Sequence, residues 1–124
     1  MPFAQHDQTT DRIRRNRRGM LAELVAAALL VAKGYRILSR RAKTPLGEID
    51  LVAARGGRVA FVEVKSRSTW QACEAAITPR TASRVRRAAD LWLQRNARFR
   101  EHEQGFDVVF VVPYRIPRHI PNGL

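Results

Sequence analysis

The chain has 124 residues, of which 45% are hydrophobic, and this composition accommodates one small globular domain and excludes a second of ordinary size. Its 23 lysines and arginines outnumber 11 acidic residues, so the net charge of +12 favours a polyanionic partner over an acidic small molecule. Nucleic acid fits this charge first. Membrane lipid and ribosomal RNA are polyanions as well, so the net charge indicates a polyanionic partner without identifying it. The net charge also does not decide whether the protein is an enzyme.

The single cysteine, Cys73, excludes an intrachain disulfide, so a cytoplasmic location is expected. Basic residues at 12–18 precede an apolar run over 20–32, as they do in a signal peptide. Glu23 interrupts this run, which is also shorter than the roughly 20 residues that a membrane-spanning helix requires. We therefore expect a buried helix and no association with a membrane.

The first 18 residues are polar and then rich in arginine, and we expect them to form a flexible basic arm, with a solvated helix start as the alternative. Strong helix formers occupy 19–33, and Gly34 follows where a left-handed C-terminal cap is expected. This helix is apolar on nearly every side. Neighbouring elements are therefore expected to cover several of its faces.

A β-hairpin is the clearest local feature. A first strand is expected over 35–42, and two further β-rich runs, 48–54 and 59–65, flank Gly56-Gly57. The two glycines can supply the positive φ angles of a type I′ turn. With these glycines as the turn, residues whose numbers sum to 113 are paired across the hairpin.

The second half of the chain alternates between loop, helix and strand. Residues 66–77 show no regular pattern and are expected to form a loop. Thr78-Pro79 is typical of a helix start, and the helix is expected to run to about residue 99 with the inner face Val85, Ala88, Ala89, Trp92 and Leu93. A last strand is expected over 106–112. Prolines at 113, 117 and 121 then exclude further regular structure.

These elements predict an α/β fold of the order α-β-β-β-α-β, in which helices flank a mixed sheet. The expected organisation is a basic arm at 1–18, one domain at 19–113 and a proline-rich tail at 114–124.

Four ionisable residues share one face of the expected hairpin, with Asp50 opposite Glu63 and Glu48 opposite Lys65. Opposed carboxylates repel each other, and Mg²⁺, which takes oxygen ligands, would offset this repulsion. Such a metal polarises a phosphoryl oxygen and activates a bound water, and Lys65 would lie beside that water. Simple solvent exposure of the polar face is the alternative. Val59 and Phe61 lie on the same face of the hairpin, which indicates that this face is only partly exposed to solvent.

Asp50, followed after twelve residues by Glu63-Val64-Lys65, resembles the acidic residue and E-x-K motif of the PD-(D/E)XK nuclease superfamily, which includes Holliday-junction resolvases. The strings GEIDLV (47–52) and FVEVKSR (61–67) are similar to the YraN-like family of small bacterial proteins, UPF0102, and the likeness extends over 19–112. Ile49 stands where the superfamily's name has proline. The resemblance implies a restriction-endonuclease-like core, with Asp50 and Glu63 as ligands of Mg²⁺ or Mn²⁺ and Lys65 as the catalytic lysine.

The resemblance also assigns residues outside the hairpin. Glu23 matches a glutamate of the first helix that often joins the metal and catalytic site, although pairing with an arginine is the alternative. Arg80 or Arg84 would supply a basic residue of the second helix. From the sequence alone, Trp70 can stack on an unpaired base, and Asp107 can orient an arginine or be structural.

The resulting hypothesis is a Mg²⁺-dependent endonuclease that hydrolyses phosphodiester bonds in DNA, with a preference for branched structures. DNA is favoured over RNA, and cleavage of two strands would suit a homodimer. A catalytically silent nucleic-acid-binding module of the same fold and a basic, ribosome-associated structural protein are the alternatives. The expected nucleic-acid contacts are Arg14, Arg15, Arg17, Arg18, Arg67, Arg80 and Arg84.

Overall fold

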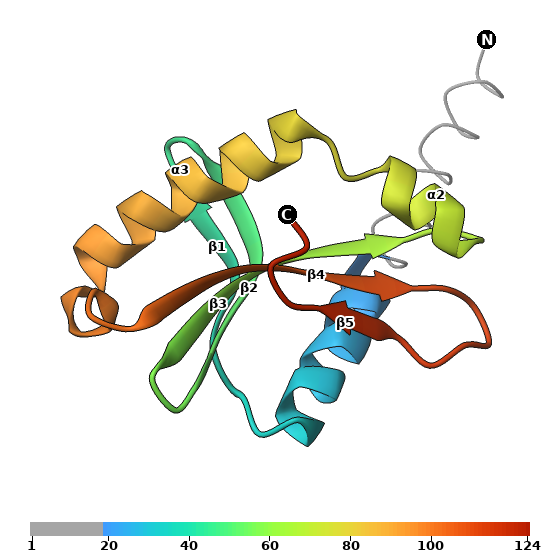
Figure 1. Ribbon diagram of the computed structural model, residues 1–124, viewed down its shortest axis with the longest axis horizontal. Helices are drawn as coiled ribbons and strands as arrows, with labels where there is room; N and C mark the ends of the chain where they lie inside the picture. Colours follow the sequence, from blue (N-terminus) through green and yellow to red (C-terminus); the bar gives the residue numbers. More distant parts are fainter. Residues whose placement is uncertain (1–18) are drawn as a thin grey trace, which may run out of the picture.

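The computed structural model describes residues 19–124, in which helices lie on both faces of a mixed sheet (Figure 1). The strands follow each other across the sheet in chain order: Arg36–Thr44 (β1), Gly47–Arg55 (β2), Arg58–Ser66 (β3), Glu103–Val111 (β4) and Arg118–Ile120 (β5). Only β3 and β4 are parallel neighbours; the other pairs are antiparallel. The helical elements are 19–32, Trp70–Ala75 (α2), Pro79–Arg95 (α3) and the 3-10 turn Ala97–Phe99 (η1). The predicted α/β class and element order are confirmed.

Helix α3 covers one face of the sheet. Thr78 caps its first turn by accepting a hydrogen bond from Thr81 N at 3.2 Å, and Pro79 occupies the first turn as predicted. The predicted inner face is confirmed, since Val85, Ala88, Ala89, Trp92 and Leu93 are all buried. The Phe61 ring of β3 lies edge-on to Trp92 with centroids 5.7 Å apart. This packing fixes α3 over the centre of β2 and β3.

The helix over 19–32 packs on the opposite face, where Ala26 and Leu30 join a buried cluster with residues of β2, β3 and β4. Gly34 has a φ of 93°, and the hydrogen bonds Gly34 N to Val31 O and Tyr35 N to Leu30 O complete the expected left-handed cap. The expectation that several faces of this helix are covered is wrong for residues 19–124. Its outer face leaves these side chains exposed: Met20, Leu21, Leu24, Val25 and Val31.

The hairpin register was predicted correctly up to a defined point. Pairs from Arg55 with Arg58 to Leu51 with Val62 all sum to 113, and the regular pairing stops there. The turn differs from the prediction, because only Gly56 has a positive φ, at 58°. A positive φ at the first central position alone is typical of a type II′ turn, not type I′.

Two short elements were missed. Residues 66–77 were expected to be a loop, but Trp70–Ala75 form α2, capped by the Thr69 hydroxyl. The prolines were expected to exclude structure after residue 113, but Arg118–Ile120 pair with β4 as an edge strand. Prolines can flank a short edge strand because they remove no hydrogen bond from within it. In the described part of the chain no helix is long and apolar enough to cross a membrane.

Candidate metal and nucleic-acid site

Asp50 lies at an interruption of the sheet. Ile49 packs in the cluster under α3, whereas Leu51 packs in the cluster under the helix 19–32, so the alternation of faces breaks at Asp50. Across the β1–β2 pair, Arg41 has a φ of 50°, a left-handed conformation that is uncommon for a non-glycine residue. This irregularity turns the carboxylate toward β3. Its Oδ2 accepts a hydrogen bond from Val64 N at 2.8 Å, in place of the predicted pairing of Asp50 with Glu63.

The surroundings of Asp50 oppose its negative charge. Burial, followed by the Glu63 carboxylate, raises the pKa of Asp50 to about 7, and Glu23 adds to the rise. The hydrogen bond from Val64 and the charge of Lys65 act in the opposite direction without cancelling it. Among residues 19–124 the second oxygen, Oδ1, accepts no hydrogen bond. Asp50 is therefore a carboxylate that a cation would stabilise.

Glu63 is held by two cations. Its side chain is buried, and Arg84 Nη2 donates to both carboxylate oxygens at 3.0 and 2.9 Å. Lys65 Nζ lies 3.1 Å from Oε1, as two residues on one face of a strand permit. Gly47 makes room for this arrangement, because a Cβ there would lie 2.8 Å from Arg84 Cγ. The sequence assigned Arg84 to nucleic acid, and the structure places it against Glu63.

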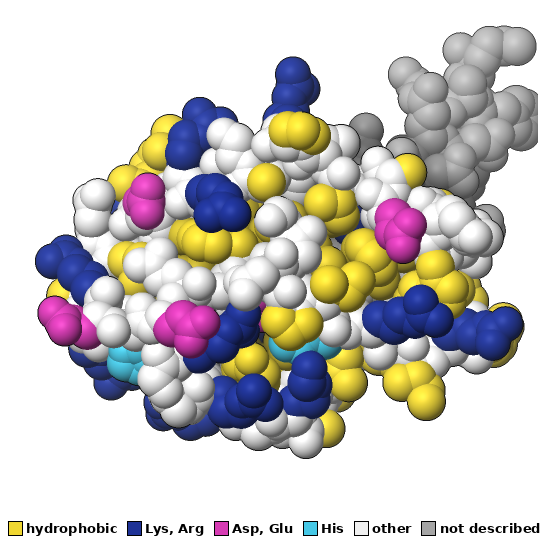
Figure 2. All heavy atoms as spheres, viewed as in Figure 1, with side chains coloured by type: hydrophobic (Ala, Val, Ile, Leu, Met, Phe, Trp, Pro, Cys, Tyr) yellow, Lys and Arg dark blue, Asp and Glu magenta, His cyan; other side chains and the backbone are white. Residues whose placement is uncertain are grey.

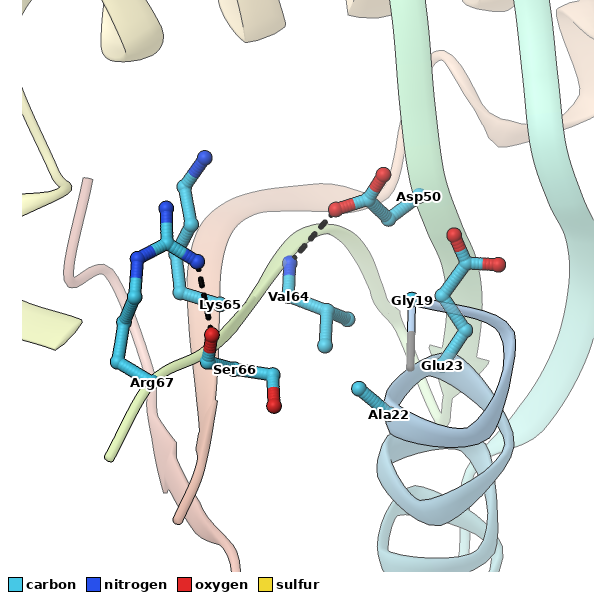
Figure 3. Close-up of a pocket in the computed structure, with 8 residues that line it drawn as sticks. All are labelled: Gly19, Ala22, Glu23, Asp50, Val64, Lys65, Ser66 and Arg67. Atoms are coloured by element: carbon cyan, nitrogen blue, oxygen red, sulfur yellow. Dashed lines mark hydrogen bonds between the residues drawn. The ribbon is translucent and has the colours of Figure 1, made fainter. Parts of the chain in front are cut away.

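Glu23 and Asp50 line one pocket. Figure 3 shows the Glu23 side chain rising from the helix toward Asp50, while the Lys65 and Arg67 side chains extend from the end of β3. Glu23 also accepts a hydrogen bond from Arg41 Nε at 2.7 Å. Glu23 therefore pairs with an arginine and also lies beside Asp50, so the structure contains both of the arrangements expected for it. The full lining of the pocket is Gly19, Ala22, Glu23, Asp50, Val64, Lys65, Ser66 and Arg67.

The pocket's donors suit a hard cation. Within residues 19–124 no three acidic, histidine or cysteine side chains are close enough to hold a metal by themselves. The charge on Asp50 is nevertheless compensated only in part, and the carboxylate oxygens of Glu23 line the same pocket. Mg²⁺ and Mn²⁺ accept such ligands, and Mg²⁺ keeps several of its waters. Glu63 does not line the pocket, so a metal held by Asp50 and Glu63 together stays a prediction. A metal-binding role for Glu23 stays a prediction.

The predicted nucleic-acid contacts are spread over several elements. Arg67 is exposed and lines the pocket, and Arg80 is exposed in the first turn of α3. Trp70 lies at the start of α2, where the Arg118 guanidinium stacks 4.0 Å from the centre of its ring. The predicted contacts Arg14, Arg15, Arg17 and Arg18 lie outside the described residues.

A second charged cluster surrounds Asp107 in β4. Arg58 donates to both of its oxygens at 2.8 and 2.7 Å, and His119 Nε2 lies 2.8 Å from Oδ2. Gly105 leaves space for Arg58, since a Cβ there would lie 2.0 Å from Nη2. Asp107 does orient an arginine. His119 was missed, because a histidine between prolines carries no sequence signal for this contact.

Comparison with known proteins connects this geometry to a family. The sequence model described as "Uncharacterised protein family UPF0102" matches residues 22–111, a range that includes Asp50, Glu63 and Lys65. A UPF0102 protein of Rhodopseudomonas palustris (strain HaA2) is 47% identical over 121 residues, covering 98% of this chain and 94% of the relative. One from Rhizobium etli (strain CIAT 652) is 46% identical over 98% of this chain and 99% of the relative. One from Brucella canis is 49% identical over 84% of this chain and 82% of the relative.

Proposed function

We propose that this chain, which belongs to the UPF0102 family, is a divalent-metal-dependent endonuclease that hydrolyses phosphodiester bonds in DNA. The observation that carries the proposal is the under-compensated charge of Asp50, beside a buried Glu63 that is itself paired with Lys65. Structural carboxylates are normally satisfied by their partners, whereas perturbed carboxyl groups in a pocket are typical of functional sites. The net charge of +12 supports a polyanionic substrate.

Asp50 and Glu63 would hold the cation, which would polarise the phosphoryl oxygen and activate a water. Lys65 can orient the attacking water and neutralise charge that develops on the phosphate, because its ammonium lies beside Glu63 at the pocket. Arg67 follows on the pocket's rim and is exposed. Its guanidinium can hold a neighbouring phosphate of the same strand by two parallel hydrogen bonds. No residue of the pocket is assigned to contact base edges, so we propose that the protein recognises the shape of DNA and not its base sequence.

A catalytically silent nucleic-acid-binding module of the same fold is the second candidate, and one observation favours it. Arg84 and Lys65 neutralise Glu63, and Arg41 neutralises Glu23, so these two carboxylates are satisfied without a metal. A module of this kind would keep the basic surface and bind nucleic acid without cutting it. Its affinity would fall steeply with salt, because phosphate contacts release counterions.

A homodimer fits the exposed face of the helix 19–32. That face is apolar, and Glu23, the only charged residue among 19–32, is buried on the other side. Contact between two copies at this face would remove its apolar side chains from water. Light scattering should report a dimer for the wild type and a monomer for Leu24→Lys. A wild-type monomer, alone and with DNA, would remove the dimer from the proposal.

Cleavage of linear, flapped and four-way-junction DNA tests the main proposal. We expect Mg²⁺- or Mn²⁺-dependent nicking by the wild type, with branched substrates cut fastest, and no cutting by Asp50→Asn. Binding to the same DNA should survive in Asp50→Asn, because the substitution leaves every basic residue in place. Salt-sensitive binding by the wild type with no cleavage of any substrate would select the silent module.

A further inference from the structure

The loop that joins β4 to β5 presents two large apolar side chains to solvent. Tyr114 is 105% exposed and Ile116 is 82% exposed, the highest values among the exposed large hydrophobic residues of 19–124. Tyr114 also has a φ of 63°, which non-glycine residues seldom adopt. Backbone strain of this kind is concentrated at binding sites, where it holds a side chain in a required position.

This loop begins at the end of the sheet where β3 and β4 both finish, and the carboxylate pocket is lined by residues at the end of β3. Strands β3 and β4 are parallel and end together, and Arg67 N donates to Val111 O at 3.2 Å just beyond their ends. A second hollow shares Ser66 and Arg67 with the carboxylate pocket and extends to Val111 and Pro113. The two hollows therefore adjoin at Arg67, and the second, which Leu21 and Val25 also line, reaches Pro113, the residue that precedes Tyr114.

Beyond Pro113 the surface is aromatic and cationic. A third hollow is lined by Trp70, Tyr114, Arg115, Ile116, Pro117 and Arg118, and none of these residues is acidic. The Arg118 guanidinium stacks on the Trp70 ring at 4.0 Å. Figure 2 shows hydrophobic and basic side chains gathered side by side over the right-hand end of the molecule, where Figure 1 places α2 and the β4–β5 loop.

We propose that Tyr114, with Ile116 beside it, forms a stacking surface for the unpaired bases of a nucleic-acid strand that leaves the carboxylate pocket, while the Trp70 ring holds Arg118 nearby. Aromatic faces flanked by arginines are the chemistry that single-stranded nucleic acid requires, because bases stack on the rings while guanidinium groups contact the phosphates. A fully paired duplex would not use this surface, since its bases are already stacked. The assignment rests on the proposed function and adds that the substrate carries a single-stranded segment.

The test measures binding without divalent metal, so that it does not depend on cleavage. Fluorescein-labelled duplexes, either blunt or with a short single-stranded extension, are titrated with the full chain in EDTA. A second set carries 2-aminopurine in the extension, whose fluorescence falls when the base stacks. The variants are Tyr114→Ala, Tyr114→Phe and Ile116→Ala. Leu46→Ala, which shortens an exposed apolar side chain of the turn between β1 and β2, is the control.

The wild type and Leu46→Ala should bind the extended duplex roughly tenfold more tightly than the blunt one and quench 2-aminopurine. Tyr114→Ala and Ile116→Ala should lose this preference while keeping their affinity for blunt duplex, and Tyr114→Phe should retain it. Equal wild-type binding of both duplexes, or a preference that survives Tyr114→Ala, would overturn the proposal. If the protein cleaves no DNA in a metal-dependent assay, only the nuclease proposal is overturned, because the fluorescence of 2-aminopurine reports base stacking in the absence of metal.

Discussion

Asp107 and Asp50 are two aspartates of one sheet in opposite electrostatic states. Asp107 is fully buried, and burial alone would raise the pKa of its carboxyl. Hydrogen bonds from Arg58 and His119 outweigh that effect and hold the pKa of Asp107 below its usual range. Within residues 19–124, Asp50 receives one hydrogen bond, from Val64 N, and its pKa is raised to about 7.

The difference separates a structural acid from a candidate functional one. The partners of Asp107 join distant parts of the chain, because Arg58 begins β3, His119 lies in β5, and Asn122 N donates at 2.9 Å. The hydroxyl of Tyr35 accepts from Arg58 as well, and Lys33 Nζ contacts His119 Nδ1. Asp50 has no comparable set of partners within residues 19–124. Among residues 19–124, the side chains around Asp107 compensate its charge, whereas those around Asp50 compensate its charge only in part.

Removing the charge of Asp107 should have the largest effect on stability. Asp107→Asn leaves the Arg58 guanidinium without its anionic partner in a largely buried position, and breaking such a pair costs about 3–5 kcal/mol. Urea unfolding followed by circular dichroism would measure the loss. Asp90→Asn, on the exposed face of α3, is the control and should change stability little. A loss as small as that of the control would mean that Asp107 is not the structural acid.

Lys65→Met should slow cleavage by roughly 10²–10³-fold, the usual cost of removing one preorganised group that stabilises developing charge. DNA affinity should fall only slightly, because one of many positive charges is lost. Single-turnover cleavage of a branched substrate measures the rate. Lys43→Met removes an exposed lysine outside the pocket and should leave the rate unchanged. If the two variants cleave equally fast, Lys65 has no role in the reaction.

Asp50→Asn should stabilise the protein at pH 8, the reverse of the effect at Asp107. The folded chain holds the Asp50 proton up to about pH 7. An unfolded aspartate releases its proton near pH 3.9, so the wild type loses stability as the pH rises between these values. Asparagine removes this cost and keeps an oxygen for Val64 N. The expected gain at pH 8 is roughly 1–3 kcal/mol, which thermal unfolding can measure.

The same comparison at pH 4 is the control, because both chains are then neutral at this position and should differ little. A stability gain of equal size at both pH values would show that the Asp50 charge is not its cause.

The smallest expected effect concerns Arg84. Its guanidinium donates to both oxygens of Glu63 and would compete there with the proposed metal, so Arg84→Met should strengthen Mn²⁺ binding, by roughly fivefold or less. Calorimetric titration gives the affinity. Arg80→Met, which removes an exposed charge one turn earlier, is the matched control. Weaker Mn²⁺ binding in Arg84→Met would indicate that the arginine positions Glu63 for the metal and does not compete with it.

Much of the fold could be predicted from local sequence signals. Gly56-Gly57 defined the hairpin register, and Thr78-Pro79 with the spacing of Val85, Ala88 and Trp92 defined helix α3 and its buried face. Helix α2 and strand β5 were missed because six and three residues are too few to show a periodicity. The predicted tail 114–124 therefore contains an edge strand of the sheet.

Of the predicted site residues, the structure places Glu23, Asp50 and Lys65 around one pocket, but the sequence did not predict the geometry of that pocket. The left-handed conformation of Arg41 has no sequence signal, and it accompanies the break that turns Asp50 toward Val64 N. The pairing of Arg84 with Glu63 depends on how α3 lies on the sheet, which spacing along the chain does not determine. The contact between Arg58 and Asp107 joins residues 49 positions apart across parallel strands, beyond the reach of local patterns.

Calorimetric titration of Mn²⁺ into the wild type and Asp50→Asn at pH 8 tests the central claim most directly, because both chains fold and differ in one charge. We predict that the wild type binds Mn²⁺, that this binding is lost in Asp50→Asn, and that it weakens below about pH 7, where a proton competes for the carboxylate. Equal Mn²⁺ binding by the two chains, or none by the wild type, would contradict the claim that Asp50 is left for a cation.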